Sequence, residues 1–264
     1  MDHALFFFEL FLIGIGVGLI SGALGLGGGI LMVPAFLAFV PGLDAHTAKG
    51  TSLFIIIFVS IINAWRLDKN FLNHPWALAG LLALGSIFGS YGAAFVTARM
   101  SEDTVLVLFM LLIAVLAIRT FFLKDRPVLE DDVHRRNGLA LSIGLVAGIV
   151  GGGTGTGGGA VLIPLALMMG LTTNREAVGL SNTVMIATSL AGSLAHLRAA
   201  EIYPQTWVVG HVYFALVPLV FIGAQVGSPV GKWINHRLTL ERRRVAMGVM
   251  LLLITGQLLY RLFQ

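Results

Sequence analysis

Long apolar windows without charged residues, separated by short polar stretches, dominate this chain. Eight windows contain no Asp, Glu, Lys or Arg, and most approach the roughly 20 residues that span a bilayer as a helix. They are Leu10–Leu43, Gly50–Trp65, Pro75–Ala98, Thr104–Ile118, Asn137–Asn174, Ala177–Ala195, Val212–Gly231 and Val245–Tyr260. The pattern predicts an all-α integral membrane protein.

The first and fifth windows are too long for one crossing. Leu10–Leu43 has 34 residues, and a helix of that length would measure about 51 Å at 1.5 Å per residue. A hydrocarbon core is only about 30 Å thick. Each long window must therefore contain a break, and we place it at the glycine cluster that each contains.

The two glycine clusters repeat each other. Gly14–Pro34 reads GIGVGLISGALGLGGGILMVP, and Gly144–Pro164 reads GLVAGIVGGGTGTGGGAVLIP. At an offset of 130 the second copy matches Gly14, Gly18, Gly22, Gly25, Gly27, Gly28, Gly29 and Pro34. Irregular backbone at membrane depth persists only where protein buries it or where it lines a polar cavity. Paired broken segments in two halves of a chain are typical of a transporter's binding site.

The repeat extends to the rest of each half. Ala48–Leu53 corresponds to Ala177–Asn182, and Ser60 corresponds to Ser189. Small residues four positions apart then follow in both halves, and such residues let membrane helices approach closely. The small residues are Gly85, Gly89 and Ala93 in the first half and Gly223, Gly227 and Gly231 in the second. Each half thus holds five segments, so the second half should enter the membrane from the opposite side.

Charge supports this inverted arrangement. With the amino terminus outside, thirteen Lys and Arg residues fall on cytoplasmic loops and four on the other side, as the positive-inside rule expects. We therefore predict a first inverted repeat over 1–123, a cytoplasmic connection over 124–137 and a second repeat over 138–264. Between eight and ten helices should cross or half-cross the membrane.

Composition excludes several other classes. The chain is 57% apolar and 11% charged, with a mean hydropathy of +0.91, so the lipid bilayer is an expected partner. The pI near 9.8 reflects basic loops, and no nucleic-acid partner is expected. There is no cysteine, which excludes disulfides and thiolate metal sites. The acidic start of the chain is unlike a signal peptide, and we interpret it as a retained first membrane segment.

The glycine run Ser21–Pro34 (SGALGLGGGILMVP), with AKGTSL at Ala48–Leu53, resembles the TauE/SafE sulfite exporter (TSUP) family. The resemblance covers essentially the whole chain. In the second half Thr154 and Thr156 interrupt the glycines, and Ser181-Asn182 stands in place of the Thr-Ser-Leu signature. The resemblance implies a bacterial or archaeal inner-membrane carrier of sulfite, sulfonates or related small anions.

Helix starts expose unpaired N–H groups and the positive end of the helix dipole, so they attract anions. Glycine lets an anion approach those amides closely. We therefore expect backbone donors at the breaks, or alternatively tight packing by small residues. The candidate backbone positions are Gly25, Gly27, Gly28, Gly155, Gly157 and Gly158.

Hydroxyl, amide and ammonium groups complete the predicted substrate site. We place Thr51 and Ser52, like Ser181 and Asn182, where a helix begins, so they could also act as helix caps. Lys49 could neutralise an anion, or it could extend to the membrane interface. The candidate side chains are Ser21, Lys49, Thr51, Ser52, Thr154, Thr156, Ser181 and Asn182. His196 and His211 flank a polar loop and could carry protons.

Other activities find little support. The residues Gly153–Gly158 fit GxGxxG, but that pattern has meaning only between a strand and a helix. The apolar segments hold no paired carboxylates, HExxH or Ser/His/Asp arrangement, so we expect neither an enzyme nor a cofactor or metal. The prediction is alternating access of a small anion at a midplane site. An anion channel and a membrane-embedded enzyme or binding subunit are the alternatives, and the small-residue faces would also allow a homodimer.

Overall fold

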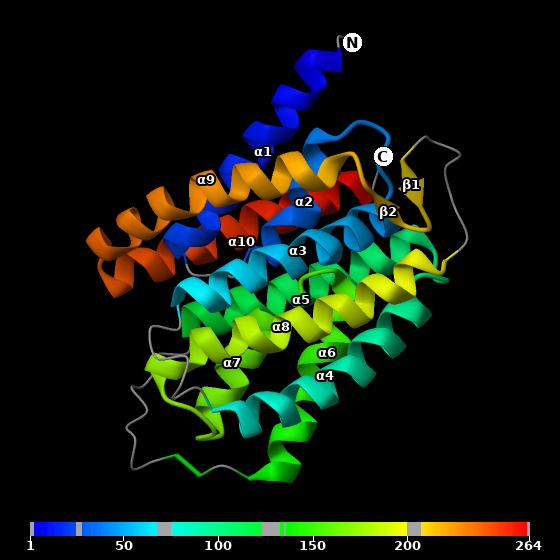
Figure 1. Cartoon of the computed structure of the whole chain (residues 1–264). Coiled ribbons are helices and arrows are strands. Elements are labelled where there is room, and N and C mark those ends of the chain that lie inside the picture. The colour runs from blue at the N-terminus through cyan, green and yellow to red at the C-terminus, as the bar shows by residue number, and fades with distance from the viewer. Residues whose placement is uncertain are drawn as a thin grey trace.

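The computed structural model describes residues 3–24, 28–67, 75–122, 133–134, 136–199 and 207–262. In these residues the chain forms ten helices and one short hairpin (Figure 1). The elements are α1 (His3–Leu24), α2 (Gly29–Phe39), α3 (Ala45–Leu67), α4 (Trp76–Thr97), α5 (Glu102–Phe122), α6 (Asn137–Thr154), α7 (Gly159–Met168), α8 (Asn174–Leu197), β1 (Val208–Val209), β2 (Val212–Tyr213), α9 (Leu216–Arg237) and α10 (Leu240–Leu262).

Both long apolar windows are broken at their glycines, as predicted. Helix α1 ends before the first cluster and α2 begins after it, and the second cluster separates α6 from α7 in the same way. The residues that precede the short helices, Gly28 and Gly158, have φ of 76° and 80°, a conformation that glycine adopts without steric cost. With 11 and 10 residues, α2 and α7 are about 15 Å long, half of a hydrocarbon core.

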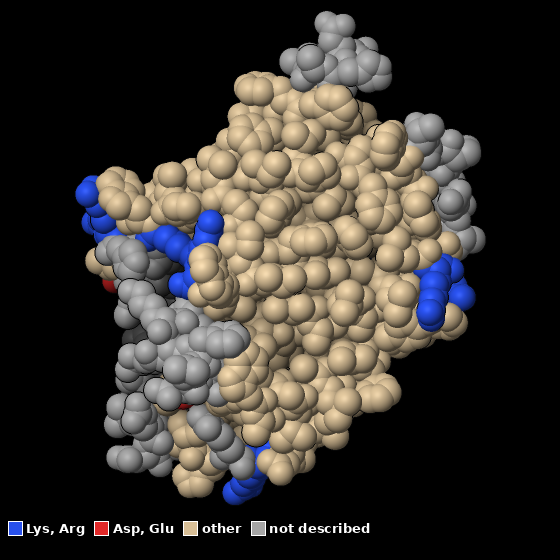
Figure 2. Space-filling view, viewed as in Figure 1, with Lys and Arg blue, Asp and Glu red and all other residues tan. Residues whose placement is uncertain are grey.

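The prediction of an all-α membrane protein is confirmed. Seven described helices, α1, α3, α4, α5, α6, α8 and α10, are long and apolar enough to cross a membrane. Figure 2 shows a wide band without charged side chains, with lysine and arginine confined to its edges. Large exposed apolar side chains such as Phe88, Val115 and Leu253 fit this lipid-facing belt.

The helices form three layers (Figure 1). In the middle, α3 packs on α8, and α5 packs on α10. Helix α1 lies along α9 on one side of this middle layer, and α6 lies along α4 on the other. Each outer pair therefore combines a helix from the first half of the chain with one from the second half.

Small residues let the two helices of each outer pair approach each other closely. A Cβ atom on Gly18 of α1 would lie 2.2 Å from the carbonyl oxygen of Ala224 on α9, and one on Gly148 of α6 would lie 2.4 Å from that of Ser86 on α4. The predicted small-residue faces are the other sides of these contacts: Gly85 and Gly89 meet α6, whereas Gly223, Gly227 and Gly231 meet α1. Because both faces are covered within the chain, they offer no surface to a second copy.

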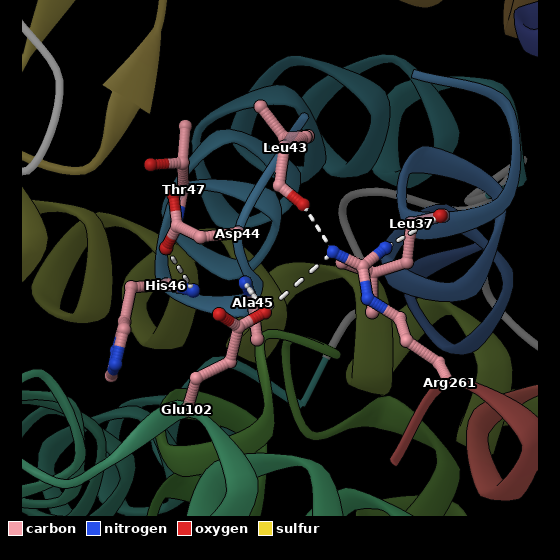
Figure 3. Close-up of polar contacts among 8 residues, drawn as sticks. All are labelled: Leu37, Leu43, Asp44, Ala45, His46, Thr47, Glu102 and Arg261. Carbon is pink, nitrogen blue, oxygen red and sulfur yellow. Dashed lines mark hydrogen bonds and ion pairs between the residues drawn. The ribbon is translucent and has the colours of Figure 1, made fainter. Parts of the chain in front are cut away.

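A polar cluster joins four helices where α2 and α10 end and α3 and α5 begin. Arg261 of α10 donates hydrogen bonds to the carbonyl oxygens of Leu37 and Leu43, and its Nη2 lies 3.6 Å from Glu102 Oε1. The same carboxylate oxygen accepts a 2.9 Å hydrogen bond from the backbone N–H of Ala45 (Figure 3). We call this side of the molecule the Lys49 end, because α3, which carries Lys49, begins here.

Candidate functional site

Helix α3 begins earlier than the sequence analysis placed it. Asp44 caps the helix: its Oδ1 accepts hydrogen bonds from the backbone N–H groups of His46 (2.8 Å) and Thr47 (3.0 Å) (Figure 3). This capping satisfies N–H groups that the first turn leaves unpaired. Thr51 and Ser52 therefore lie well inside α3, and the prediction that the helix starts at them was wrong.

The same correction applies to α8. Thr173 caps this helix and accepts a 3.3 Å hydrogen bond from the N–H of Glu176. Ser181 and Asn182 therefore lie two turns inside the helix and do not cap it. Both side chains are buried in the helix bundle.

The side chain of Lys49, a residue of α3, contacts the end of α6, directly before the second glycine break. Its Nζ donates hydrogen bonds to the carbonyl oxygen of Gly153 (3.2 Å) and to Thr97 Oγ1 (3.0 Å) on α4. One turn further along α3, Ser52 Oγ donates a 2.9 Å hydrogen bond to the carbonyl oxygen of Gly155. Two side chains of α3 thus donate hydrogen bonds to carbonyl oxygens at the second glycine break.

The Lys49 side chain is buried and forms no ion pair within the described residues. The residue is 0% exposed, so it does not extend to the interface, which was the alternative to a functional role. Both of its hydrogen-bond acceptors are neutral, and no carboxylate of the described residues lies within ion-pair distance of it. Burying an unpaired charge is costly, which makes this position attractive to an anion.

The two glycine breaks meet about halfway along α3. A Cβ on Gly29, the first residue of α2, would lie 2.1 Å from the carbonyl oxygen of Thr156. Ile56 of α3 contacts both breaks, at 2.8 Å from the Cβ position of Gly29 and 3.1 Å from that of Gly157. Because α2 and α7 both begin here, the positive ends of two half-length helices lie in one region.

Unpartnered hydroxyl groups face the start of α7. Ser181 Oγ lies 3.0 Å from the Cβ position of Gly159, and Ser189 Oγ lies 3.0 Å from that of Gly157. Both residues are at most 1% exposed, and neither hydroxyl has a hydrogen-bond partner in the described part of the chain. Ser60 of α3 is in the same state. The sequence matched Ser60 with Ser189 but did not mark either as a site residue.

The remaining predicted residues divide into those near the breaks and those held elsewhere. Thr154 and Thr156 hydrogen-bond each other through their hydroxyls at 3.1 Å, within the second break. Ser21 Oγ lies 3.5 Å from the Cβ position of Gly28. Thr51 accepts a hydrogen bond from the N–H of Tyr213, and Asn182 donates to the carbonyl oxygen of Val178. Gly25 and Gly27 are outside the described residues.

Three histidines form a buried cluster at the Lys49 end. His196 Nδ1 of α8 and His211 Nδ1 of the hairpin are 3.1 Å apart, a hydrogen-bond distance. The ring of His46 lies 5.2 Å from that of His211. All three residues are at most 5% exposed, whereas the sequence suggested a loop-edge position for His196 and His211. Sequence reasoning missed His46, which lies far from the other two in the chain.

Comparisons with known proteins agree with this architecture. The profile of the family described as "Sulfite exporter TauE/SafE" matches residues 10–258. A Bacillus subtilis protein named "Probable membrane transporter protein YunE" is 27% identical over 277 residues, covering 96% of this chain and 97% of the relative. A Methanocaldococcus jannaschii protein named "Probable membrane transporter protein MJ0441" is 26% identical, covering 92% of this chain and 91% of the relative. No solved structure matches the chain.

The family description and the relatives' names are those of transporters, not of enzymes. They fit a chain in which seven of the described helices are long and apolar enough to cross a membrane. A match that spans nearly the whole sequence shows the family. This multi-pass membrane transporter belongs to the sulfite exporter TauE/SafE family.

Proposed function

We propose that the protein is a secondary carrier of small oxyanions, with sulfite and sulfonates as substrates, and that the anion binds beside Lys49 and the start of α7. The observation that carries this proposal is the fully buried Lys49 side chain, which lies against the second glycine break and forms no ion pair within the described residues. A bound anion would supply the missing counter-charge. The family description as a sulfite exporter supports the choice of substrate.

The two half-length helices suit an oxyanion for a second reason. The start of a helix offers N–H groups and a partial positive charge without a titratable group. The hydroxyls of Ser181 and Ser189 would add two donors beside the start of α7. Donors from several directions match the oxygens of a sulfite or sulfonate group, since each oxygen can accept more than one hydrogen bond.

The layered packing supports alternating access by relative movement of the two outer helix pairs. We place α1, α2 and α9 in one moving body and α4, α6 and α7 in the other, with α3 and α8 between them. These bodies mix the two sequence halves, so the movement we propose differs from a simple rocking of 1–123 against 138–264. The inverted relation of those halves remains part of the proposal, and the corresponding pairs α1–α9 and α6–α4 support it.

Counterflow in liposomes tests the proposal. Purified protein is reconstituted in vesicles loaded with unlabelled sulfite, and the entry of labelled sulfite is followed, with taurine, sulfoacetate, thiosulfate and sulfate as competitors. A carrier gives saturable exchange that depends on internal substrate. Absence of exchange with any of these anions would contradict the proposal, whereas continuous single-channel currents would favour a channel.

The role of the breaks is tested by Gly28→Val combined with Gly158→Val. Both positions have positive φ, where a β-branched residue is strained. Gly42→Val is a matched control, because Gly42 also has positive φ but lies in an exposed turn with no atom near its Cβ position. The double variant should lose exchange, and the control should retain it. Equal exchange by the double variant and wild type would refute the glycine site.

A further inference from the structure

The histidine cluster has buried nitrogen atoms that no protein group satisfies. Within the described residues, His196 Nε2 and His46 Nδ1 have no hydrogen-bond partner, and neither does Asp44 Oδ2. Buried polar atoms are normally hydrogen-bonded, so each exception needs an explanation. The unsatisfied atoms lie on three elements, the turn before α3, α3 itself and α8, which makes a local packing defect a poor explanation.

The His196–His211 pair can accept one more proton. Its Nδ1–Nδ1 hydrogen bond requires one ring to carry the proton on Nδ1 and the other ring to accept it. The donor ring is then neutral, with a free lone pair on Nε2. A proton that binds this Nε2 turns the donor ring into an imidazolium without breaking the bond between the rings. With His196 as the donor ring, its unpartnered Nε2 is such a position.

The cluster is next to the proposed anion site. Lys49 lies one helical turn from His46, so the two side chains share a face of α3. The hairpin packs tightly on the adjacent residue: a Cβ on Gly50 would lie 2.2 Å from the carbonyl oxygen of His211 and 3.1 Å from His196 Cβ. An anion beside Lys49 would therefore act on all three rings across a buried region of low dielectric constant.

Burial is the main factor that disfavours protonation of the empty cluster. Burial lowers the pKa of His211, which lies in the hairpin outside the membrane-spanning helices, to about 4, and the neighbouring His46 contributes to the lowering. The other charged groups that face the cluster in the described chain are Asp44 and Lys49. Glu102 contacts Arg261 and the backbone N–H of Ala45 at the start of α3 (Figure 3). An arriving negative charge offsets the Lys49 ammonium and so favours protonation.

We propose that the His46–His196–His211 cluster binds a proton that is transported together with the anion. Proton and anion binding are then linked: each raises the affinity for the other by the same factor. The bound proton offsets part of the charge of a dianion beside Lys49, which lowers the cost of burying the loaded site. In the described residues no three His, Asp or Glu side chains are arranged to hold a metal ion, so we assign a proton as the ligand.

This proposal rests on the carrier function, and two assays on the full-length protein separate them. Counterflow of labelled sulfoacetate at equal pH on both sides needs anion binding and alternating access but no net proton movement. Net uptake driven by an inside-alkaline gradient, with the membrane potential clamped, needs the proton as well. Sulfoacetate is suitable because its carboxylate titrates well below neutral pH, so the substrate carries no proton itself.

For wild type we expect both activities, and with one proton per anion a gradient of one pH unit should raise accumulation up to about tenfold. His196→Gln and His211→Gln should lose the response to the gradient, and their counterflow should need more sulfoacetate for half-saturation, because anion binding no longer gains from the linked proton. His46→Gln provides a third variant should either of the others fail to fold. His134→Gln, an exposed histidine near the opposite end of the bundle, is the control and should behave as wild type.

The outcomes distinguish the two proposals. Wild-type uptake that ignores the pH gradient, or folded cluster variants that keep the full response, would overturn the proton site and leave the carrier intact. Absence of wild-type counterflow would overturn the carrier, and the proton site with it. A proton-sensitive dye inside the vesicles should also record acidification on adding sulfoacetate for wild type and His134→Gln, but not for the cluster variants.

Discussion

Lys49→Met is the most informative single substitution, because it should weaken anion binding strongly while leaving the stability of the empty protein nearly unchanged. Methionine has a similar length and apolar volume but no charge. If a bound anion is the counter-charge for Lys49, the variant loses a charge-assisted hydrogen bond. Such bonds contribute about 1.5–3 kcal/mol, which corresponds to a roughly 10- to 150-fold weaker apparent affinity.

The empty protein should tolerate the change. The substitution removes a 0% exposed ammonium that has only neutral partners, and replacing buried ionic groups by apolar ones of similar size is often neutral or stabilising. Against this, the carbonyl oxygen of Gly153 and Thr97 Oγ1 lose a donor, at about 1 kcal/mol each. We therefore expect thermal stability near that of wild type, together with a large loss of transport affinity.

The assay pairs the concentration dependence of sulfite counterflow with thermal unfolding in detergent. Lys232→Met is the matched control, because Lys232 is a partly buried lysine of α9 at the opposite end of the bundle. It should leave the half-saturating sulfite concentration unchanged. Wild-type affinity in folded Lys49→Met protein would refute the claim that Lys49 binds the anion. A Lys49→Met protein that unfolds easily would instead mark the ammonium as structural.

Further substitutions test the helix packing and the ion pair of Arg261. Gly29→Ala should impair transport, since its Cβ would lie 2.1 Å from the Thr156 carbonyl oxygen, whereas Gly16→Ala, with nothing within 4 Å, should be silent in the same counterflow assay. Gly18→Ala, whose Cβ would lie 2.2 Å from an atom of α9, should lower the free energy of unfolding by about 1–3 kcal/mol through overpacking. An equal melting temperature for Gly18→Ala and Gly16→Ala would contradict this. Arg261→Gln removes the partly exposed ion pair with Glu102 and should lower the melting temperature by a few degrees, with counterflow retained.

The features that the sequence predicted are those determined by local length and composition. Leu10–Leu43 is longer than a membrane is thick, and it contains one glycine cluster, so the position of the break followed directly. Small residues four apart marked helix faces that pack closely, and those faces do pack on α1 and α6. In each case the physical cause is contained in a few consecutive turns of the chain.

The errors at the helix starts had local signals that were overlooked. Asp44 is a strong N-cap residue, and Thr173 with Glu176 three positions later forms the pattern of a capping box. The predicted helix starts at Thr51 and Ser181 gave these capping residues no weight. Weighing capping residues before polarity would have placed both helix starts correctly.

The histidine cluster and the burial of Lys49 had no local signal. His46 and His211 are 165 positions apart in the sequence, and only the packing of the hairpin on α3 brings their rings within 5.2 Å. Lys49 is buried because α4 and α6 supply Thr97 and Gly153 as acceptors. A lysine at the start of an apolar window normally reaches the interface, so sequence alone favoured the wrong environment.

The chemistry of the site is less symmetric than its backbone. Both halves supply a short helix that begins at mid-depth after a positive-φ glycine. The counterpart of Lys49 in the second half, however, is Val178, which is 45% exposed. A lysine at this position would point away from the breaks. The His46–His196–His211 cluster also lies at the Lys49 end. Helix dipoles can therefore attract an anion from either side, whereas charge neutralisation and proton binding act on one side only. In the mechanism we propose, this asymmetry ties proton binding to the conformation that opens toward the Lys49 end.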